Sequence, residues 1–211
     1  MSYTAMRIYL LLIVSVLSGC FNRDEVQKQA ENYDSPEQYH DAIKLWSAII
    51  EKYPNDVYAI TSRGNDYLGI EELEKAKKDF LLGSKLYYYN IVALSNLAYI
   101  YYHEDKKYDS ALFYVNKAIK NKPTLYLKYK SIFSEEARKS KKVEYSMKHQ
   151  YNVEYAFLMA QRGLIYEKLN IYDSAYKDLS YAFRSGYLWD SVPEKTNILK
   201  LKLKEDTLKV E

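Results

Sequence analysis

The chain has 211 residues, of which 28% are charged and 16% aromatic, and its formal net charge is +3. So small a charge gives no global argument for binding nucleic acid, and we expect no nucleic-acid partner. There is one cysteine, so the fold must be held by packing rather than by disulfides. The compositional anomaly is the number of tyrosines, 25 against 6 phenylalanines and 2 tryptophans. A codon bias toward Tyr, Lys, Asn and Ile is one explanation for many of them, and recognition is the functional alternative, because tyrosine is enriched at interfaces.

The N-terminal segment 1–19 has the parts of a secretory signal. Arg7 supplies a positive charge, and the apolar stretch Ile8–Leu17 follows it. This stretch is too short to span a bilayer, which needs about 20 residues. It ends in Leu17-Ser18-Gly19-Cys20, which resembles the lipobox of bacterial lipoproteins. The resemblance implies that segment 1–19 is a signal peptide and that Cys20 carries the lipid, a palmitate-type anchor, and no other cofactor.

Acylation at Cys20 implies a location for the mature chain, residues 20–211. It would be tethered to the cell membrane on the extracytoplasmic side, with a net charge of +2, because the signal removes one base (Arg7) and no acid. In a Gram-negative cell, Phe21 stands where inner-membrane lipoproteins carry an aspartate. The resemblance therefore favours the outer membrane, and surface exposure stays open.

The rest of the chain repeats itself. Ala42, Ala76, Ala111 and Ala175 recur at successive sequence offsets of 34, 35 and 64. Another small residue precedes each of these alanines by 12 or 13 positions. A tyrosine follows each of the preceding small residues by three positions. A bulky residue follows each alanine by four positions. In chain order the small residues are Ala30, Gly64, Ala98 and Gly163, the tyrosines are Tyr33, Tyr67, Tyr101 and Tyr166, and the bulky residues are Trp46, Phe80, Val115 and Leu179.

This spacing resembles the tetratricopeptide repeat (TPR), a helix–turn–helix unit of about 34 residues. Two antiparallel helices pack closely only where small side chains let their backbones approach, and the bulky residues fill the space beside those contacts. The resemblance implies an all-α TPR helix–turn–helix solenoid with about four recognisable repeats. We place TPR repeats 1–3 within residues 20–125, at 23–56, 57–90 and 91–125, and repeat 4 at 156–189.

Between repeats 3 and 4 the pattern is lost. Residues 124–162 contain neither glycine nor proline, which favours helix over loop. We interpret 126–155 as a degenerate helical pair, whose second helix can continue into repeat 4, and 190–211 as a polar-faced C-terminal cap. Residues 128–148 hold seven basic and three acidic side chains. They form either a solvated face or a surface turned to anionic lipid headgroups.

Repeats 2 and 4 share a second pattern, an arginine followed 16 positions later by an aspartate. The pairs are Arg63 with Asp79 and Arg162 with Asp178. We expect each arginine to face its aspartate across a helix pair, as a structural latch worth no more than about 1 kcal/mol if exposed.

By resemblance, the first helices of repeats 2 and 3 line the concave groove of a TPR superhelix. Asn65 and Asn96 match the asparagines of TPRs that clamp a peptide's terminal carboxylate, but Thr61 stands where such clamps have lysine. The resemblance therefore implies a groove that grips an internal segment or a helix of a partner. Its candidate residues are Tyr58, Thr61, Ser62, Asn65 and Leu68 from repeat 2, and Ser95, Asn96, Tyr99 and Tyr102 from repeat 3.

No catalytic constellation is recognisable, so an enzyme is not expected. The three histidines fall in separate segments without metal-ligand spacing, and phosphate-loop and nucleophile-elbow motifs are missing. We expect neither a metal nor a small-molecule substrate. The predicted function is a membrane-anchored adaptor or scaffold that binds a protein of the bacterial cell envelope. The alternative is a self-associating or membrane-surface module that uses the basic segment 128–148.

Overall fold

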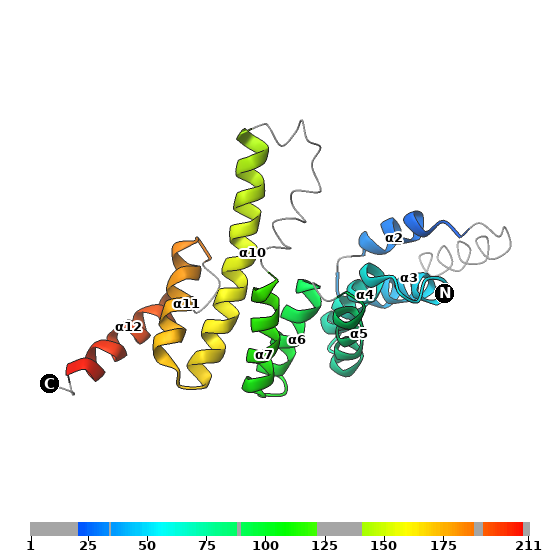
Figure 1. Cartoon of the computed structure of the whole chain (residues 1–211). Helices are drawn as coiled ribbons and strands as arrows, with labels where there is room; N and C mark the ends of the chain where they lie inside the picture. The colour runs from blue at the N-terminus through cyan, green and yellow to red at the C-terminus, as the bar shows by residue number, and fades with distance from the viewer. Residues whose placement is uncertain (1–20, 34, 88–89, 122–140, 188–191, 209–211) are drawn as a thin grey trace. The chain divides into compact units, whose positions relative to one another are not determined.

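The computed structural model describes residues 21–33, 35–87, 90–121, 141–187 and 192–208 (Figure 1). Every regular element in these residues is an α-helix, and successive helices pair as antiparallel helix–turn–helix hairpins. The predicted all-α TPR fold is therefore confirmed. The lipobox and Cys20 lie outside the described residues. Within those residues, no helix is both long enough and apolar enough to cross a bilayer.

The helices fall into two compact bodies, which divide the chain between Tyr88 and Tyr89. The N-terminal body holds two hairpins, α2 with α3 and α4 with α5, and α3 packs on α4. Asn22 and Asp56 cap α2 and α4 by accepting backbone N–H groups, and Arg23 donates to Asp56 at 2.6 Å. The bounds are α2 Arg23–Glu31, α3 Tyr39–Lys52, α4 Val57–Gly69 and α5 Leu73–Leu86.

Close helix contacts in the N-terminal body occur where the sequence places its small residues. Ala42 and Ala76 are fully buried, as is Phe80. A Cβ built on Gly64 would lie 2.8 Å from Cε1 of Phe80, which is too close. The missing side chain at position 64 therefore lets α4 approach α5 with the phenylalanine ring between them.

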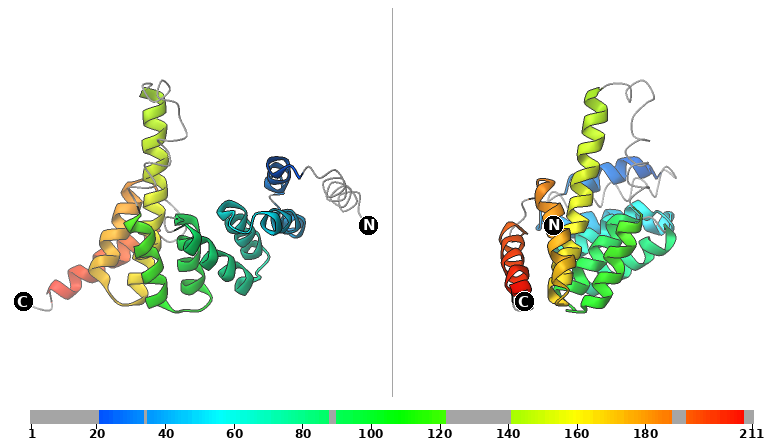
Figure 2. Two further views of the ribbon diagram at one scale, coloured as in Figure 1. Left: turned by 45° about the vertical axis from the view of Figure 1, so that its right-hand side comes forward. Right: turned by 60° about the vertical axis from the view of Figure 1, so that its left-hand side comes forward.

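The C-terminal body repeats this arrangement and adds a terminal helix. The helix α6 pairs with α7, the C-terminal half of α10 pairs with α11, and α12 packs on α11 (Figures 1 and 2). The helix α12 buries Val192, Thr196 and Leu199 but leaves Ile198 and Leu201 exposed, so the outer face of the predicted cap is not wholly polar. The bounds are α6 Ile91–His103, α7 Tyr108–Lys120, α10 Lys141–Lys168, α11 Tyr172–Arg184 and α12 Val192–Leu208.

The helix α10 is continuous for 28 residues, across the boundary at 155/156 that the sequence suggested. It packs directly on α6 and α7, because Leu158 and Ile165 of α10 share one core with Leu94, Ala98 and Val115. The hairpin α10/α11 therefore stacks on the hairpin α6/α7. Residues 122–140, which hold most of the first part of the predicted degenerate pair, lie outside the described residues.

The turns inside three hairpins share a backbone feature that the sequence pattern did not reveal. Glu71, Lys106 and Asn170 have positive φ angles of 61°, 49° and 60°. Each precedes its repeat alanine by five positions. The next N–H in each of these turns donates to the carbonyl of the repeat tyrosine: Glu72 to Tyr67 and Ile171 to Tyr166 at 2.9 Å, and Lys107 to Tyr101 at 2.8 Å. This left-handed residue closes the first helix in the manner of a Schellman motif.

Candidate functional site

The two predicted arginine–aspartate pairs are both formed, and both are bidentate. Arg63 donates from Nε and Nη2 to Asp79 at 2.8 and 2.9 Å. Arg162 donates in the same way to Asp178 at 2.5 and 3.0 Å. The aspartate side chains are only 5% and 3% exposed, so the limit of about 1 kcal/mol for an exposed latch does not apply to these pairs.

The aspartates stabilise the charged form of both arginines. The hydrogen bond to Asp79 raises the pKa of Arg63. Burial opposes the charged form of Arg162, but the bonds to Asp178 outweigh burial and raise its pKa as well. Both guanidinium groups are therefore ionised at neutral pH.

Each arginine also reaches back to the preceding hairpin. Arg63 Nη1 donates to Ser47 Oγ and Arg162 Nη1 donates to Asn116 Oδ1, both at 3.1 Å. The separations along the sequence are 16 and 46, so the second contact closes a much longer stretch of chain. The hairpin α10/α11 is thus the neighbour of α6/α7. In the sequence, the additional residues come after α7 and before the repeat part of α10.

The predicted groove residues of the N-terminal body are largely engaged within it. The Tyr58 hydroxyl donates to Glu31 Oε1 at 2.6 Å, and its ring packs edge-on against Trp46. Burial and the Glu31 carboxylate raise the pKa of Tyr58 to about 12. Thr61 is buried and its hydroxyl donates to the Val57 carbonyl at 2.7 Å. Tyr58 therefore joins α4 to α2 and α3, whereas the bond of Thr61 lies within α4.

The remaining predicted groove residues are divided between the N-terminal and the C-terminal body. Ser62 is partly buried and Asn65 exposed in the N-terminal body, whereas Asn96 is partly buried in the C-terminal body. A groove built on both asparagines stays a prediction. Tyr99 and Tyr102, by contrast, meet in a pocket of the C-terminal body.

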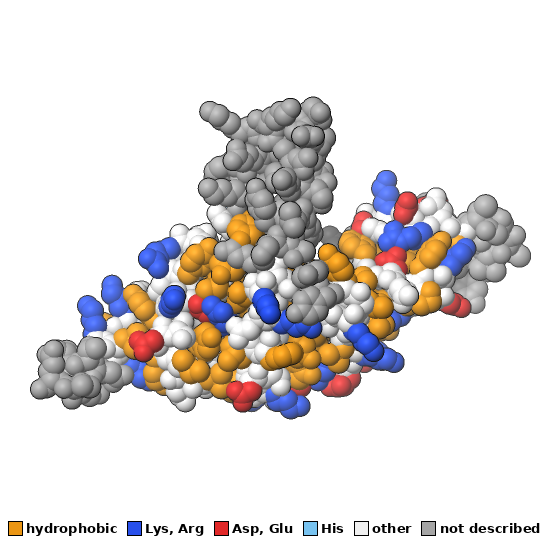
Figure 3. Space-filling view, viewed as in Figure 1, with side chains coloured by type: hydrophobic (Ala, Val, Ile, Leu, Met, Phe, Trp, Pro, Cys, Tyr) orange, Lys and Arg blue, Asp and Glu red, His pale blue; other side chains and the backbone are white. Residues whose placement is uncertain are grey.

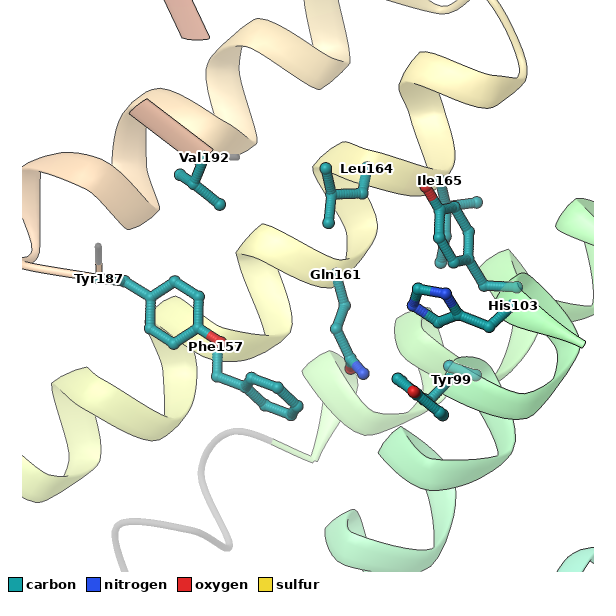
Figure 4. A pocket seen from close by; sticks show the side chains of 10 residues that line it. Tyr99, His103, Phe157, Gln161, Leu164, Ile165, Tyr187 and Val192 are labelled. Carbon is teal, nitrogen blue, oxygen red and sulfur yellow. The ribbon is translucent and has the colours of Figure 1, made fainter. Parts of the chain in front are cut away.

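That pocket has a volume of about 260 Å³ and is lined mainly by rings and aliphatic side chains (Figure 4). It lies where the first helices of two stacked hairpins, α6 and α10, face each other beside the start of α12. Its walls are Ala98, Tyr99, Tyr102 and His103 from α6, Phe157, Gln161, Leu164 and Ile165 from α10, and Tyr187 and Val192 that flank the α11–α12 connection.

Among the described residues, none that lines the pocket carries a formal charge at neutral pH. Burial raises the pKa of Tyr102 to about 12, helped by the charge of Glu167, so the phenol stays protonated. Burial lowers the pKa of His103, against the weaker effect of Glu104, so the imidazole is mainly neutral near pH 7. The His103 ring lies 4.3 Å from the Tyr99 ring and 4.6 Å from the Tyr102 ring, centroid to centroid. The α6 wall is a continuous aromatic surface.

Gln161 supplies a polar group in the α10 wall. Its Nε2 donates to the Ser95 carbonyl of α6 at 3.3 Å, while its Oε1 is buried without a hydrogen-bond partner among the described residues. The amide therefore links α10 to α6 beside the pocket.

The surface around the described residues is mixed in character. On the face in Figure 3, Lys and Arg side chains are interspersed with acidic and hydrophobic ones. The described residues contain no group of histidine, cysteine and carboxylate side chains that could hold a metal. The side chains of the basic segment 128–148 all lie outside the part of the chain that the structure describes, so its role at a membrane stays a prediction.

Sequence reasoning found two pocket residues and missed the others, chiefly His103, Phe157, Gln161, Leu164, Tyr187 and Val192. The repeat pattern contained a signal for one of these residues, Gln161. Gln161 precedes Gly163 by two positions, as Asn96 precedes Ala98. The pattern alone does not place repeat 4 directly after repeat 3, so it does not bring Gln161 to the groove.

No protein-family model matches the chain, and neither does any curated protein. Two solved crystal structures of MamA are similar to it. One is 18% identical with a TM-score of 0.43 and aligns 77% of this chain with 91% of that chain. The other is 17% identical with a TM-score of 0.37, over 71% and 90% of the two chains. The fold assignment rests on the helix pairs and small-residue contacts described above.

Proposed function

We propose that the chain is a protein-binding adaptor whose pocket between α6 and α10 anchors a partner through one apolar side chain. The observation that carries this proposal is the pocket itself, an aromatic and aliphatic recess between the first helices of two stacked repeats. Tyr99 is 39% exposed at its rim, where a rigid amphipathic ring suits recognition. The recess is smaller than the ~300–1,000 Å³ of sites for drug-sized ligands, so a single side chain suits it better.

The lining favours a neutral side chain over a cationic one. None of the described residues that line the pocket is a carboxylate, and the nearby Glu167 is paired with Lys195. A lysine or arginine entering the pocket would lose its hydration without gaining an ion pair, which is costly. Leucine, isoleucine, phenylalanine or tryptophan would gain the burial energy of an apolar group.

Selection of random displayed peptides on the full chain tests this proposal. We expect enriched peptides to share one aromatic or branched aliphatic residue at a fixed position. Tyr99→Ala and Phe157→Ala should weaken their binding about tenfold or more, since a central contact contributes at least ~1.4 kcal/mol.

Phe113→Ala is the matched control, because Phe113 is a 61% exposed ring on α7 that does not line the pocket. It should leave binding unchanged. Enrichment of basic peptides, or equal losses from Phe113→Ala and Tyr99→Ala, would contradict the proposal.

We also propose that the adaptor is lipid-anchored through Cys20 on the extracytoplasmic side of a bacterial membrane, and that its partner is an envelope protein. The lipobox Leu17–Cys20 supports the anchor. Since α2 begins at Arg23, the first hairpin starts three positions after the acylated cysteine and has no long tether. In a Gram-negative cell the outer membrane is the proposed location, because Phe21 replaces the retention aspartate.

Cys20→Ser should abolish lipid attachment, because the hydroxyl cannot replace the thiol that is acylated. Metabolic labelling with a fatty-acid analogue should mark the wild type and not the variant, and the variant should keep segment 1–19. Equal labelling of both proteins would rule out Cys20 as the lipid site. Ser18→Ala, which keeps a small residue in the lipobox, serves as the control and should be labelled normally.

A further inference from the structure

The first described residue, Phe21, is docked on the N-terminal body. Its ring is partly buried against the core formed by α2, α3 and α4. The ring centroid lies 6.1 Å from that of Tyr53, and Lys52 Nζ lies 4.9 Å from the same Phe21 centroid. Phe21 therefore contacts the C-terminal end of α3.

The chain directly after Phe21 is held in place as well. The Asn22 side chain caps α2 by accepting a backbone N–H at 3.3 Å. Arg23 Nε donates to Asp56 Oδ2 at 2.6 Å, which joins the start of α2 to the residue that caps α4. This ion pair is partly buried, because the aspartate side chain is 10% exposed and the arginine side chain 31%. A ring contact, a helix cap and an ion pair thus fix residues 21–23 on the body.

The proposed lipid site stands next to this docked ring in the sequence. Cys20 is joined directly to Phe21, and one peptide unit spans only about 3.8 Å from Cα to Cα. A lipid on the Cys20 sulfur therefore enters the bilayer beside Phe21, since no further residue separates the anchor from the docked ring. The surface around Phe21 is the part of the N-terminal body that such an anchor brings to the membrane.

The surface around Phe21 carries side chains that suit a membrane interface. Residues 51–55, which end α3 and lead to α4, are all exposed. Tyr53 is 40% exposed, and tyrosine rings are favoured at the level of the lipid headgroups. Lys52 has a long apolar stem that can lie along lipid while its ammonium group reaches the headgroup phosphates. Because Glu51 is exposed beside Lys52, the surface is not strongly basic and requires no anionic lipid.

We propose that the N-terminal body rests on the bilayer with the end at which α2 begins and α3 ends, and that the docked Phe21 ring fixes this orientation. The turn between α2 and α3 then points away from the membrane. The helix α3 has 14 residues and is about 20 Å long, so its two ends lie at different distances from the lipid. The inference rests on the proposed lipid anchor at Cys20, and it is independent of what the pocket in the C-terminal body binds.

Quenching by lipid tests this orientation in the mature acylated chain, reconstituted into phosphatidylcholine vesicles that carry nitroxide-labelled headgroups. Acylation blocks the single native thiol, so Asn55→Cys and Glu37→Cys each offer one site for a fluorescent label. Asn55 is exposed close to Tyr53, and Glu37 is exposed in the segment between α2 and α3. We expect quenching at position 55 to exceed quenching at position 37 about twofold or more, because about 20 Å of helix separates the two ends of α3.

Phe21→Ala tests the role of the ring. It keeps the anchor but removes the contacts with Lys52 and Tyr53, so the difference between positions 55 and 37 should be lost while the chain still floats with the vesicles. If this variant loses its helical circular dichroism, Phe21→Leu, which keeps an apolar side chain without a ring, takes its place.

Three results would overturn the proposal. They are equal quenching at the two positions, stronger quenching at position 37, and a difference that survives the loss of the Phe21 ring. A wild-type chain that fails to float with the vesicles would overturn the lipid anchor at Cys20 and this orientation with it. Flotation therefore distinguishes a failure of the anchor from a failure of the orientation alone.

Discussion

Asp178→Ala is expected to lower the free energy of unfolding of the C-terminal body by about 3–5 kcal/mol. The carboxylate is 3% exposed and accepts two hydrogen bonds from Arg162, which also donates to Asn116 of the preceding hairpin. Removing the aspartate leaves a largely buried guanidinium without its anion, in the contact between two hairpins. Denaturant unfolding of the full chain, followed by far-UV circular dichroism, measures the loss.

Two matched variants separate this effect from a general sensitivity to charge. Arg162→Met combined with Asp178→Leu removes both charges together and should recover most of the loss, since no unpaired ion remains. Asp24→Ala removes an aspartate whose side chain is 90% exposed and which also pairs with an arginine, and should cost less than about 1 kcal/mol. Equal effects of Asp178→Ala and Asp24→Ala would show that the buried pair does not hold the repeats together.

Phe80→Ala is expected to destabilise the N-terminal body by about 3–5 kcal/mol, because it empties a fully buried position between α4 and α5. Gly64→Ala alone should cost about 1–3 kcal/mol, since its Cβ would lie 2.8 Å from the Phe80 ring. The reason for both effects is the same contact, so the two changes should not be additive.

Combining the two changes tests that shared cause. In the Phe80→Ala background the ring is gone, and Gly64→Ala should then cost nothing or stabilise, because alanine is a better helix former than glycine. Urea unfolding of the four proteins in this cycle gives the coupling energy. Additive losses would mean that position 64 is not held small by the phenylalanine ring.

The repeat pattern was sufficient to predict the helix pairs and both arginine–aspartate pairs. Small residues at fixed spacing report close helix contacts directly, and Gly64, Ala76 and Ala175 fulfil that role. The burial of the pairs could not be read from the pattern, because the spacing along the chain is the same for an exposed and a buried latch.

The pocket could not be predicted, because it depends on which hairpins are neighbours. The interval between Ala111 and Ala175 is nearly twice the repeat length, so it has room for another repeat. Only the contacts of α10 with α6 and α7 show that the two hairpins stack directly. Phe157 and Gln161 then face Tyr99 and His103, a juxtaposition that no spacing along the chain encodes.

Photo-cross-linking from the pocket tests most directly whether a partner protein is held there. The full chain would carry p-benzoylphenylalanine in place of Tyr99 and, in a second protein, in place of the exposed Phe113 on α7. After irradiation in intact cells, we predict one dominant cross-linked protein from position 99, lost when Phe157→Ala is added, and little cross-linking from position 113. Efficient cross-linking from position 113 with none from position 99 would contradict the assignment of the pocket as the partner site.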